Sequence, residues 1–364
     1  MINFYDITFK RLIVHQIVAK QTGQEHATLF LENELVDIDQ NVEAIIKERL
    51  SSAASKQAKA FELEIENYHG GTFFGLVHKM KEMPNAEFIQ ASVDISHLLA
   101  ESQTKNSMPG GYLFVIEAVN KDSRMVYIAI KAELHEALRF ETKNSAGFLR
   151  FFDDIFMTPQ QKLYKFGLIY ELPPDERIDD GTVPYPNNQY GCFLFDSQFN
   201  IDSKPAEYFY KDFLGFTIDT NPKIQSKKFY TNTENFIKSK IPESEKKDDL
   251  LKVLKHEFLT NEEPEIIPKD FSDTYFHDEE VKTAYQNEII EYLPEFVIKD
   301  PSLIKGQLER KKVVFPQKVT ISGTNNTFDY NVHIIKTQED LNELDPESPD
   351  YTIIKILGKP YQGE

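Results

Sequence analysis

Four β-type runs follow one another between residues 111 and 196, and their connections constrain the fold more than any other feature of the chain. The runs GYLFVIEAV and RMVYIAIKAE are separated by Asn-Lys-Asp-Ser at 120–123, a composition typical of a hairpin turn. Two more runs follow at 161–172 and 191–196, with a Pro-, Asp- and Asn-rich surface loop expected between them. Because a short turn joins antiparallel neighbours, we predict an antiparallel sheet.

Helical patterns flank this predicted sheet. Residues 26–36 predict a strand, and Asn41 is a suitable N-cap for a helix that runs to about Phe61, since apolar residues recur there at helical spacing. A second helix is expected from 88 to 102. The aromatic-rich run AEYFYKDFLGF predicts a further helix with Gly215 at its C-terminal end.

The pattern changes twice in the rest of the chain. Residues 226–241, 244–259 and 279–293 have the spacing of amphipathic helices, and Pro242 and Pro294 end two of them. The runs VVFPQKVTISG, TFDYNVHII and TIIKIL are then β-type again. We therefore predict an α+β fold made of a mixed α/β domain with an antiparallel sheet at 1–204, a helical middle module at 205–312 and a small β module at 313–364.

The sequence contains no recognisable motif for catalysis or cofactor binding. The glycine-rich nucleotide loops and the serine-nucleophile elbow are absent, and the single cysteine, Cys192, lies in an apolar strand pattern typical of a buried thiol. The acidic segment 270–280 allows two interpretations. Asp273 and His277 would face one metal ion in a hydrolase or nuclease if the stretch were helical, or the stretch is a junction between helices with Asp278 as an N-cap. We predict a non-enzymatic protein without a metal or cofactor.

The charge of the chain limits how it could bind nucleic acid. Lys+Arg total 41 and Asp+Glu 59, which gives a net charge of −18, whereas a duplex binder usually shows a basic footprint. Any phosphate-binding surface must therefore be local. Two groups of cations are candidates, and solvated, exposed side chains are the alternative for both. The first group is Lys223, Lys227, Lys228, Lys238 and Lys240, and the second is Lys305, Arg310, Lys311 and Lys312.

Helical geometry makes the first group more specific. Lys227 and Lys238 are eleven residues apart, which is close to three full turns, so both are expected on one side of the helix. Phe229 and Phe236 are expected on the other side, facing the core. We therefore predict that Lys227 and Lys238 both point to solvent.

Several stretches resemble one bacterial family, in the same order and over most of the chain. FKRLIVHQIV resembles the opening strand of the nucleoid-associated 37-kDa proteins, with its central histidine at His15, and SMPGGYLFVI resembles the Gly-Gly pair and strand of that family. YFYKDFLGF resembles its Phe-x-x-Phe-Leu-Gly element, which ends here at Gly215. VTISGTNNTFDYNV followed by TIIKILGKP resembles its C-terminal strand, turn and strand, with Asn325 and Asn326 in place of the usual turn glycines.

The resemblance implies a cytoplasmic protein of the bacterial nucleoid that binds DNA and self-associates, and it offers no catalytic residues. We therefore predict a nucleoid-associated DNA-binding protein, acting as an oligomer such as a dimer, with the two groups of cations as its DNA contacts. The alternative is an adaptor that meets chromosomal enzymes or a bacterial defence complex through protein surfaces, without touching DNA. No run approaches the length of a membrane span, so no membrane partner is predicted.

Overall fold

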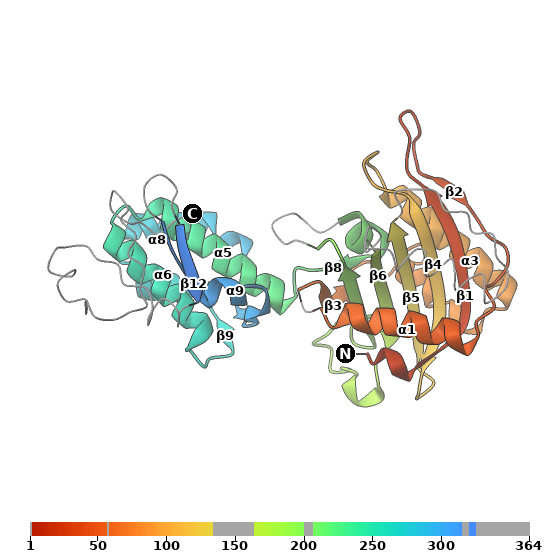
Figure 1. Ribbon diagram of the computed structural model, residues 1–364. Coiled ribbons are helices and arrows are strands. Elements are labelled where there is room, and N and C mark those ends of the chain that lie inside the picture. The colour runs from red at the N-terminus through yellow and green to blue at the C-terminus, as the bar shows by residue number, and fades with distance from the viewer. Residues whose placement is uncertain (1, 57, 134–163, 200–206, 315–319, 325–364) are drawn as a thin grey trace, which may run out of the picture. The chain divides into compact units, whose positions relative to one another are not determined.

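The computed structural model describes residues 2–56, 58–133, 164–199, 207–314 and 320–324. The chain divides into two compact units, Met1–Asn221 and Pro222–Glu364 (Figure 1). The described residues form an α+β protein, as predicted. None of their helices is long and apolar enough to cross a membrane.

An eight-stranded sheet is the frame of the first unit (Figure 1). Its order is β2-β1-β4-β5-β6-β7-β3-β8, and the strand pairs that join these described strands are antiparallel. The hairpin predicted at 111–133 lies in the middle, with Val119 opposite Met125. The strands are β1 (Ile7–Val18), β2 (Thr28–Phe30), β3 (Ala60–Ile65), β4 (Gly111–Asn120), β5 (Met125–Glu133), β6 (Tyr164–Glu171), β7 (Tyr190–Asp196) and β8 (Phe216–Thr217).

Helix α1 (Gln40–Ala54) lies across one face of this sheet (Figure 1). Val42, Ile46 and Leu50 recur at helical spacing and form one buried cluster with strand residues such as Phe114 and Phe166. Alternate side chains of the strands point to the opposite face. Both faces of the central strands are therefore buried, which explains why those strands read as nearly continuous apolar runs.

The opposite face carries α2 (Phe73–Val77), α3 (Asn85–Ser102) and the π-helix η4 (Tyr208–Phe213). The helix predicted at 206–216 is present over Tyr208–Phe213, and Gly215 follows it with φ +72° before β8 begins at Phe216. Glycine adopts this left-handed conformation without a steric penalty. Phe213 packs against Phe73 of α2, with ring centroids 5.5 Å apart, so this helix belongs to the sheet unit.

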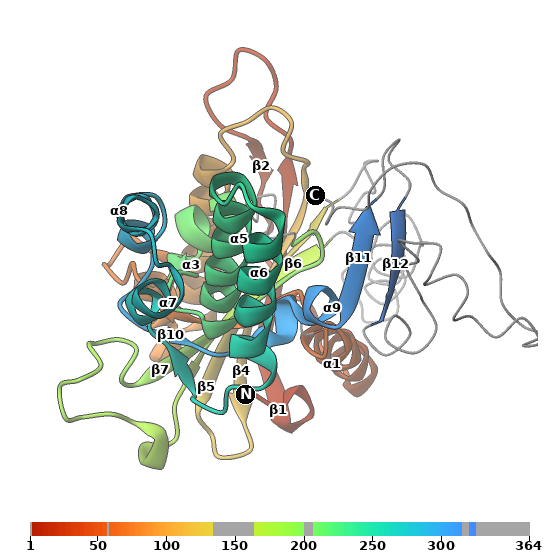
Figure 2. The ribbon, with the colours of Figure 1, turned by 90° about the vertical axis from the view of Figure 1, so that its left-hand side faces the viewer.

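The second unit is mostly helical and is built around aromatic rings. Helices α5 (Pro222–Lys240) and α6 (Ser244–Leu259) lie side by side (Figure 2). Phe236 packs edge-on against Tyr285 at 5.0 Å, and the Tyr285 hydroxyl lies 2.6 Å from Thr233 Oγ1. The remaining described elements are α7 (Pro268–Tyr275), α8 (Glu279–Glu288), α9 (Lys305–Leu308), the short helices η5 (Ile290–Tyr292) and η6 (Pro301–Leu303), the strand pair β9 (Glu265–Ile266) with β10 (Val297–Ile298), and the strand pair β11 (Arg310–Val314) with β12 (Thr320–Thr324).

Several predicted elements have different bounds in the structure. The helix expected at 279–293 ends at Glu288. The strand expected at 26–36 is reduced to Thr28–Phe30. The helix expected to reach Phe61 ends at Ala54, because Ala60 and Phe61 instead belong to β3 and pair with β7. Its N-cap is Asp39 rather than Asn41, since the Asp39 carboxylate accepts the first exposed N–H groups of the helix.

The unit boundary lies after Asn221, whereas the sequence predicts a boundary after residue 204. The side chain of Asn221 donates a hydrogen bond to the Glu62 carbonyl of β3 at 2.7 Å, which ties the segment before it to the sheet. The three-part division at 1–204, 205–312 and 313–364 stays a prediction. The runs TFDYNVHII and TIIKIL and the asparagine turn at 325–326 lie outside the described residues.

Candidate nucleic-acid interface

The first predicted group of cations lies on α5, and its surroundings limit its use. Lys227 is only 8% exposed, so it does not point to solvent as its spacing predicted. Lys238 Nζ lies 3.3 Å from a carboxylate oxygen of Glu234. Lys223 and Lys228 are half-buried on the same helix. Much of the positive charge of α5 is therefore buried or neutralised by a neighbour.

Lys240, the last member of this group, and two further lysines of the second unit show the same pairing. Nζ–O distances are 2.6 Å for Lys240 with Glu288, 2.8 Å for Lys246 with Glu243 and 2.9 Å for Lys252 with Asp249. Surface pairs of this kind add little to stability. The carboxylate of each pair nevertheless neutralises a lysine that could otherwise bind a phosphate.

The second predicted group lies where α9 is followed by β11. Lys305 Nζ is 3.7 Å from a carboxylate oxygen of Glu309. Arg310, Lys311 and Lys312 then follow as three consecutive cations at the start of β11. In this strand pair Arg310 is opposite Thr324, Lys311 opposite Gly323 and Lys312 opposite Ser322, so the partner strand brings no carboxylate to these positions.

Helix α6 adds a further cation beside this strand. Lys255 Nζ donates a hydrogen bond to the backbone carbonyl of Arg310 at 3.0 Å. The structure thus places Lys255 of α6 on the backbone of β11, the strand that follows α9, whereas on α5 Lys227 is buried and Lys238 is paired. The sequence did not indicate Lys255 as a candidate, because its closeness to β11 depends on how α6 and α9 pack.

The acidic segment 270–280 is a junction between two helices. Helix α7 ends at Tyr275 and α8 begins at Glu279, and the Asp278 carboxylate accepts the N–H groups of Glu280 and Val281 at 2.8 and 3.3 Å. This confirms the interpretation of Asp278 as an N-cap. In the part of the chain that the structure describes, no three His, Cys, Asp or Glu side chains are grouped to hold a metal ion.

His15 is buried, and both of its ring nitrogens are hydrogen-bonded. Nδ1 accepts the backbone N–H of Glu32 at 3.1 Å, so the ring proton is on Nε2, which lies 2.8 Å from Ser92 Oγ. Ser92 in turn donates to the Ile89 carbonyl of α3. Burial lowers the pKa of His15 to about 4. The neutral ring therefore links β1 to α3 and to the segment after β2, and it is not available to a phosphate.

The sequence did not reveal a row of buried charged side chains across the sheet. Lys131 of β5 is opposite Lys165 of β6, which is opposite Asp196 of β7, and each of these three residues is at most 2% exposed. Lys165 Nζ donates to Asp196 Oδ1 at 2.8 Å, and Lys131 Nζ donates to the Tyr208 hydroxyl at 2.9 Å. These cations are internal, so they are not part of a DNA surface.

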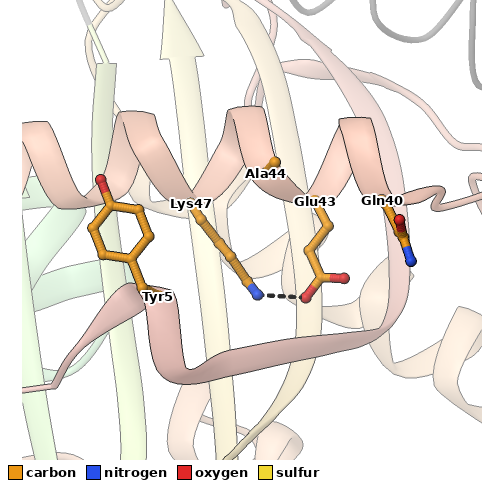
Figure 3. A pocket seen from close by; sticks show the side chains of 5 residues that line it. All are labelled: Tyr5, Gln40, Glu43, Ala44 and Lys47. Atoms are coloured by element: carbon orange, nitrogen blue, oxygen red, sulfur yellow. Dashed lines mark ion pairs between the residues drawn. The ribbon is translucent and has the colours of Figure 1, made fainter.

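A shallow pocket lies between Tyr5 and the start of α1 (Figure 3). Gln40 and Ala44 line it, together with Glu43 and Lys47, whose charged atoms are 2.7 Å apart. The two charges oppose each other, so this pocket offers no net charge to an anion.

Most of the chain matches the model of one known protein family. Residues 13–139 and 184–355 match the model of the family described as nucleoid-associated protein YejK. The chain belongs to this family. The match covers the second half of β1 with His15, the central hairpin, η4 and both groups of cations, which confirms the resemblance found in the sequence. No match was found among curated proteins. Membership supports a nucleoid-associated role for this YejK-family chain.

Proposed function

We propose that this YejK-family protein binds DNA directly and without catalysis, as an oligomer, at the nucleoid in the bacterial cytoplasm. The observation that carries the proposal is the run of three cations, Arg310, Lys311 and Lys312, on one strand of an antiparallel pair. Lys255 and Lys305 lie next to this strand. We name these five residues the basic ribbon.

A two-stranded ribbon has a suitable size for a DNA groove, and lysine and arginine supply the phosphate contacts that position it. If the ribbon neutralises about three phosphates, the logarithm of the affinity falls with a slope of about −2.7 against the logarithm of the salt concentration. Affinity should then decrease about 40-fold between 50 and 200 mM salt. We expect the half-buried Lys223 and Lys228 to contribute less to the affinity for DNA, and we expect no contribution from Lys227 or Lys238.

The test measures binding of a labelled duplex by fluorescence anisotropy across that salt range. Lys311→Glu/Lys312→Glu is expected to lower the affinity at least tenfold at 50 mM salt and to flatten the salt slope. Lys246→Glu/Lys247→Glu changes the net charge equally but lies at the other end of α6, and it should have a small effect. Equal losses in the two variants, or an affinity that ignores salt, would refute the basic ribbon as the contact.

An adaptor without DNA contact is the second candidate function. It is favoured by the ion pairs of Lys238 and Lys240 and by the net charge of −18, both of which oppose phosphate binding. No duplex binding at 50 mM salt, together with protein partners that stay bound after nuclease treatment, would favour this adaptor over the DNA-binding proposal.

A further inference from the structure

The strand pair β9–β10 has one buried face and one apolar, exposed face. Ile266 is opposite Val297, and both side chains are buried in the core of the second unit. Because side chains alternate along a strand, their neighbours point outward. Ile267 and Ile298 are each 43% exposed and Phe296 is 47% exposed. Large apolar side chains gathered in this way are typical of an interaction surface.

A groove of about 670 Å³ adjoins this face. Ile267 and Ile290 contribute its apolar part, and Lys269, Asp270 and Glu295 contribute charges. None of these three charged side chains forms an ion pair within the described residues, in contrast to the paired lysines of α5 and α6. The groove therefore combines apolar surface with charged side chains that form no ion pair in the part of the chain that the structure describes.

The charge around the groove is mainly negative. Glu265 stands opposite Ile298 in the strand pair, and Glu291 precedes Tyr292, which is 75% exposed. With Asp270 and Glu295 these side chains give four carboxylates against the single ammonium of Lys269. We name this surface, from Glu265 to Ile298, the acidic apolar face. Its chemistry fits a segment in which cations are followed by apolar residues.

One segment of the same chain has that composition. Strand β11 reads Arg-Lys-Lys-Val-Val, with three cations followed by two valines. Strand pairs β9–β10 and β11–β12 form separate sheets, and Figure 2 shows them on either side of α5 and α6. Their separation means that one copy cannot bring its own β11 onto its own acidic apolar face.

We propose that β11 of one copy docks on the acidic apolar face of a second copy. The contact is head-to-tail, because two different surfaces meet, and it can therefore continue from copy to copy. It uses the same strand that is proposed to bind DNA, so DNA and a second copy compete for it. A head-to-tail oligomer keeps one uncovered β11 at its end, and through this strand the oligomer can still bind DNA. The competition rests on the proposed function, whereas the contact between copies does not.

Sedimentation velocity of the full chain at 50 mM salt tests the contact. The weight-average mass of the wild type should rise above 42.2 kDa with increasing concentration. Asp270→Lys/Glu295→Lys should remain monomeric but still bind duplex, and Lys311→Glu/Lys312→Glu should lose both properties. Combining the two reversals exchanges the charges, so it should restore self-association without restoring DNA binding.

A second set of variants tests the apolar part without changing any charge. Phe296→Ser should weaken self-association, whereas Phe30→Ser, at a 57% exposed position on β2 of the first unit, should not. Circular dichroism checks that each variant is folded. A wild type that stays at 42.2 kDa, or a combined reversal that stays monomeric, would overturn the proposal. Self-association of a wild type that binds no duplex would refute the proposed function and leave this contact standing.

Discussion

His15 connects three segments of the first unit through one neutral ring. A second ring proton would remove the acceptor for the Glu32 N–H and would place a charge in an apolar interior. The pKa is about 4 in the fold against an ordinary value of 6.5, so the unfolded chain binds more protons between these values. The stability due to the neutral ring is therefore complete above about pH 6.5 and decreases as the pH falls toward 4. From about pH 7.5 to about pH 5 we expect a loss of about 2 kcal/mol.

Hydrogen exchange of the β1 and β4 amides, corrected for intrinsic rates, measures this loss within the sheet unit. His15→Gln keeps a hydrogen-bonding side chain that does not ionise, so it should be less protected at neutral pH and should lose this pH dependence. His256→Gln changes an exposed histidine of α6 and should behave as the wild type. Wild-type protection that is equal at both pH values would contradict the prediction.

Residue types alone do not determine which charges reach solvent. Lys131 and Lys165 are charged residues, a type that is usually exposed, but both are buried because helices cover that face of the sheet. Lys227 has the helical position of an exposed residue and is also buried. In contrast, the burial of Cys192 was predicted correctly, because its apolar neighbours already indicate it. Burial that depends on contacts far along the chain leaves no local pattern.

At the scale of elements, Gly215 controls how η4 continues into β8. Its φ is +72°, and an added Cβ would lie 2.9 Å from Asn67 Cβ and 3.0 Å from the Asn67 carbonyl oxygen. Its own carbonyl accepts the N–H groups of Glu66 and Asn67, so the turn cannot shift without weakening them. Gly215→Ala should therefore cost about 2–3 kcal/mol, from the left-handed backbone and from the steric contact.

Gly181→Ala is the matched control for this prediction. Its φ is +83°, and nothing lies within 4 Å of an added Cβ, so only the backbone cost of about 1 kcal/mol is expected. Thermal unfolding of both variants compares the two costs. Equal shifts in the melting temperature would show that the contact with Asn67 does not matter.

Elements that depend on local chemistry were predictable from the sequence. The hairpin β4–β5 follows from its turn, and α6 has the predicted bounds because its apolar spacing is regular. The end of α1 at Ala54 was not predictable, because the residues that follow still suit a helix and pairing with β7 decides otherwise. Likewise β11 begins at Arg310, before the apolar run that predicted it, because Arg310 pairs with Thr324. The candidate site depends on this pairing, so the sequence indicated four of its five cations but neither Lys255 nor the arrangement that joins them.

At the scale of the whole molecule, the net charge is −18, so positive surfaces are few. More than one anionic ligand can therefore bind the same positive surface. If β11 binds both DNA and a second copy, the two equilibria are linked, and each ligand lowers the apparent affinity of the other. Adding duplex to the self-associated wild type should therefore decrease the sedimenting protein mass per complex. Asp270→Lys/Glu295→Lys, which has no second copy to displace, should bind duplex more tightly than the wild type at high protein concentration.

This variant also makes the chain less negative, which by itself favours DNA. Glu87→Lys/Glu101→Lys makes the same change of charge at exposed positions on α3 and so measures that general effect. The Asp270/Glu295 variant should bind duplex more tightly than this control only at high protein concentration. At low concentration, where few copies are associated, the difference in affinity should vanish. Protein that instead accumulates on the duplex with a mass that rises with concentration would show that self-association and DNA binding use separate surfaces. Competition is thus the one property that distinguishes a shared β11 from two independent sites.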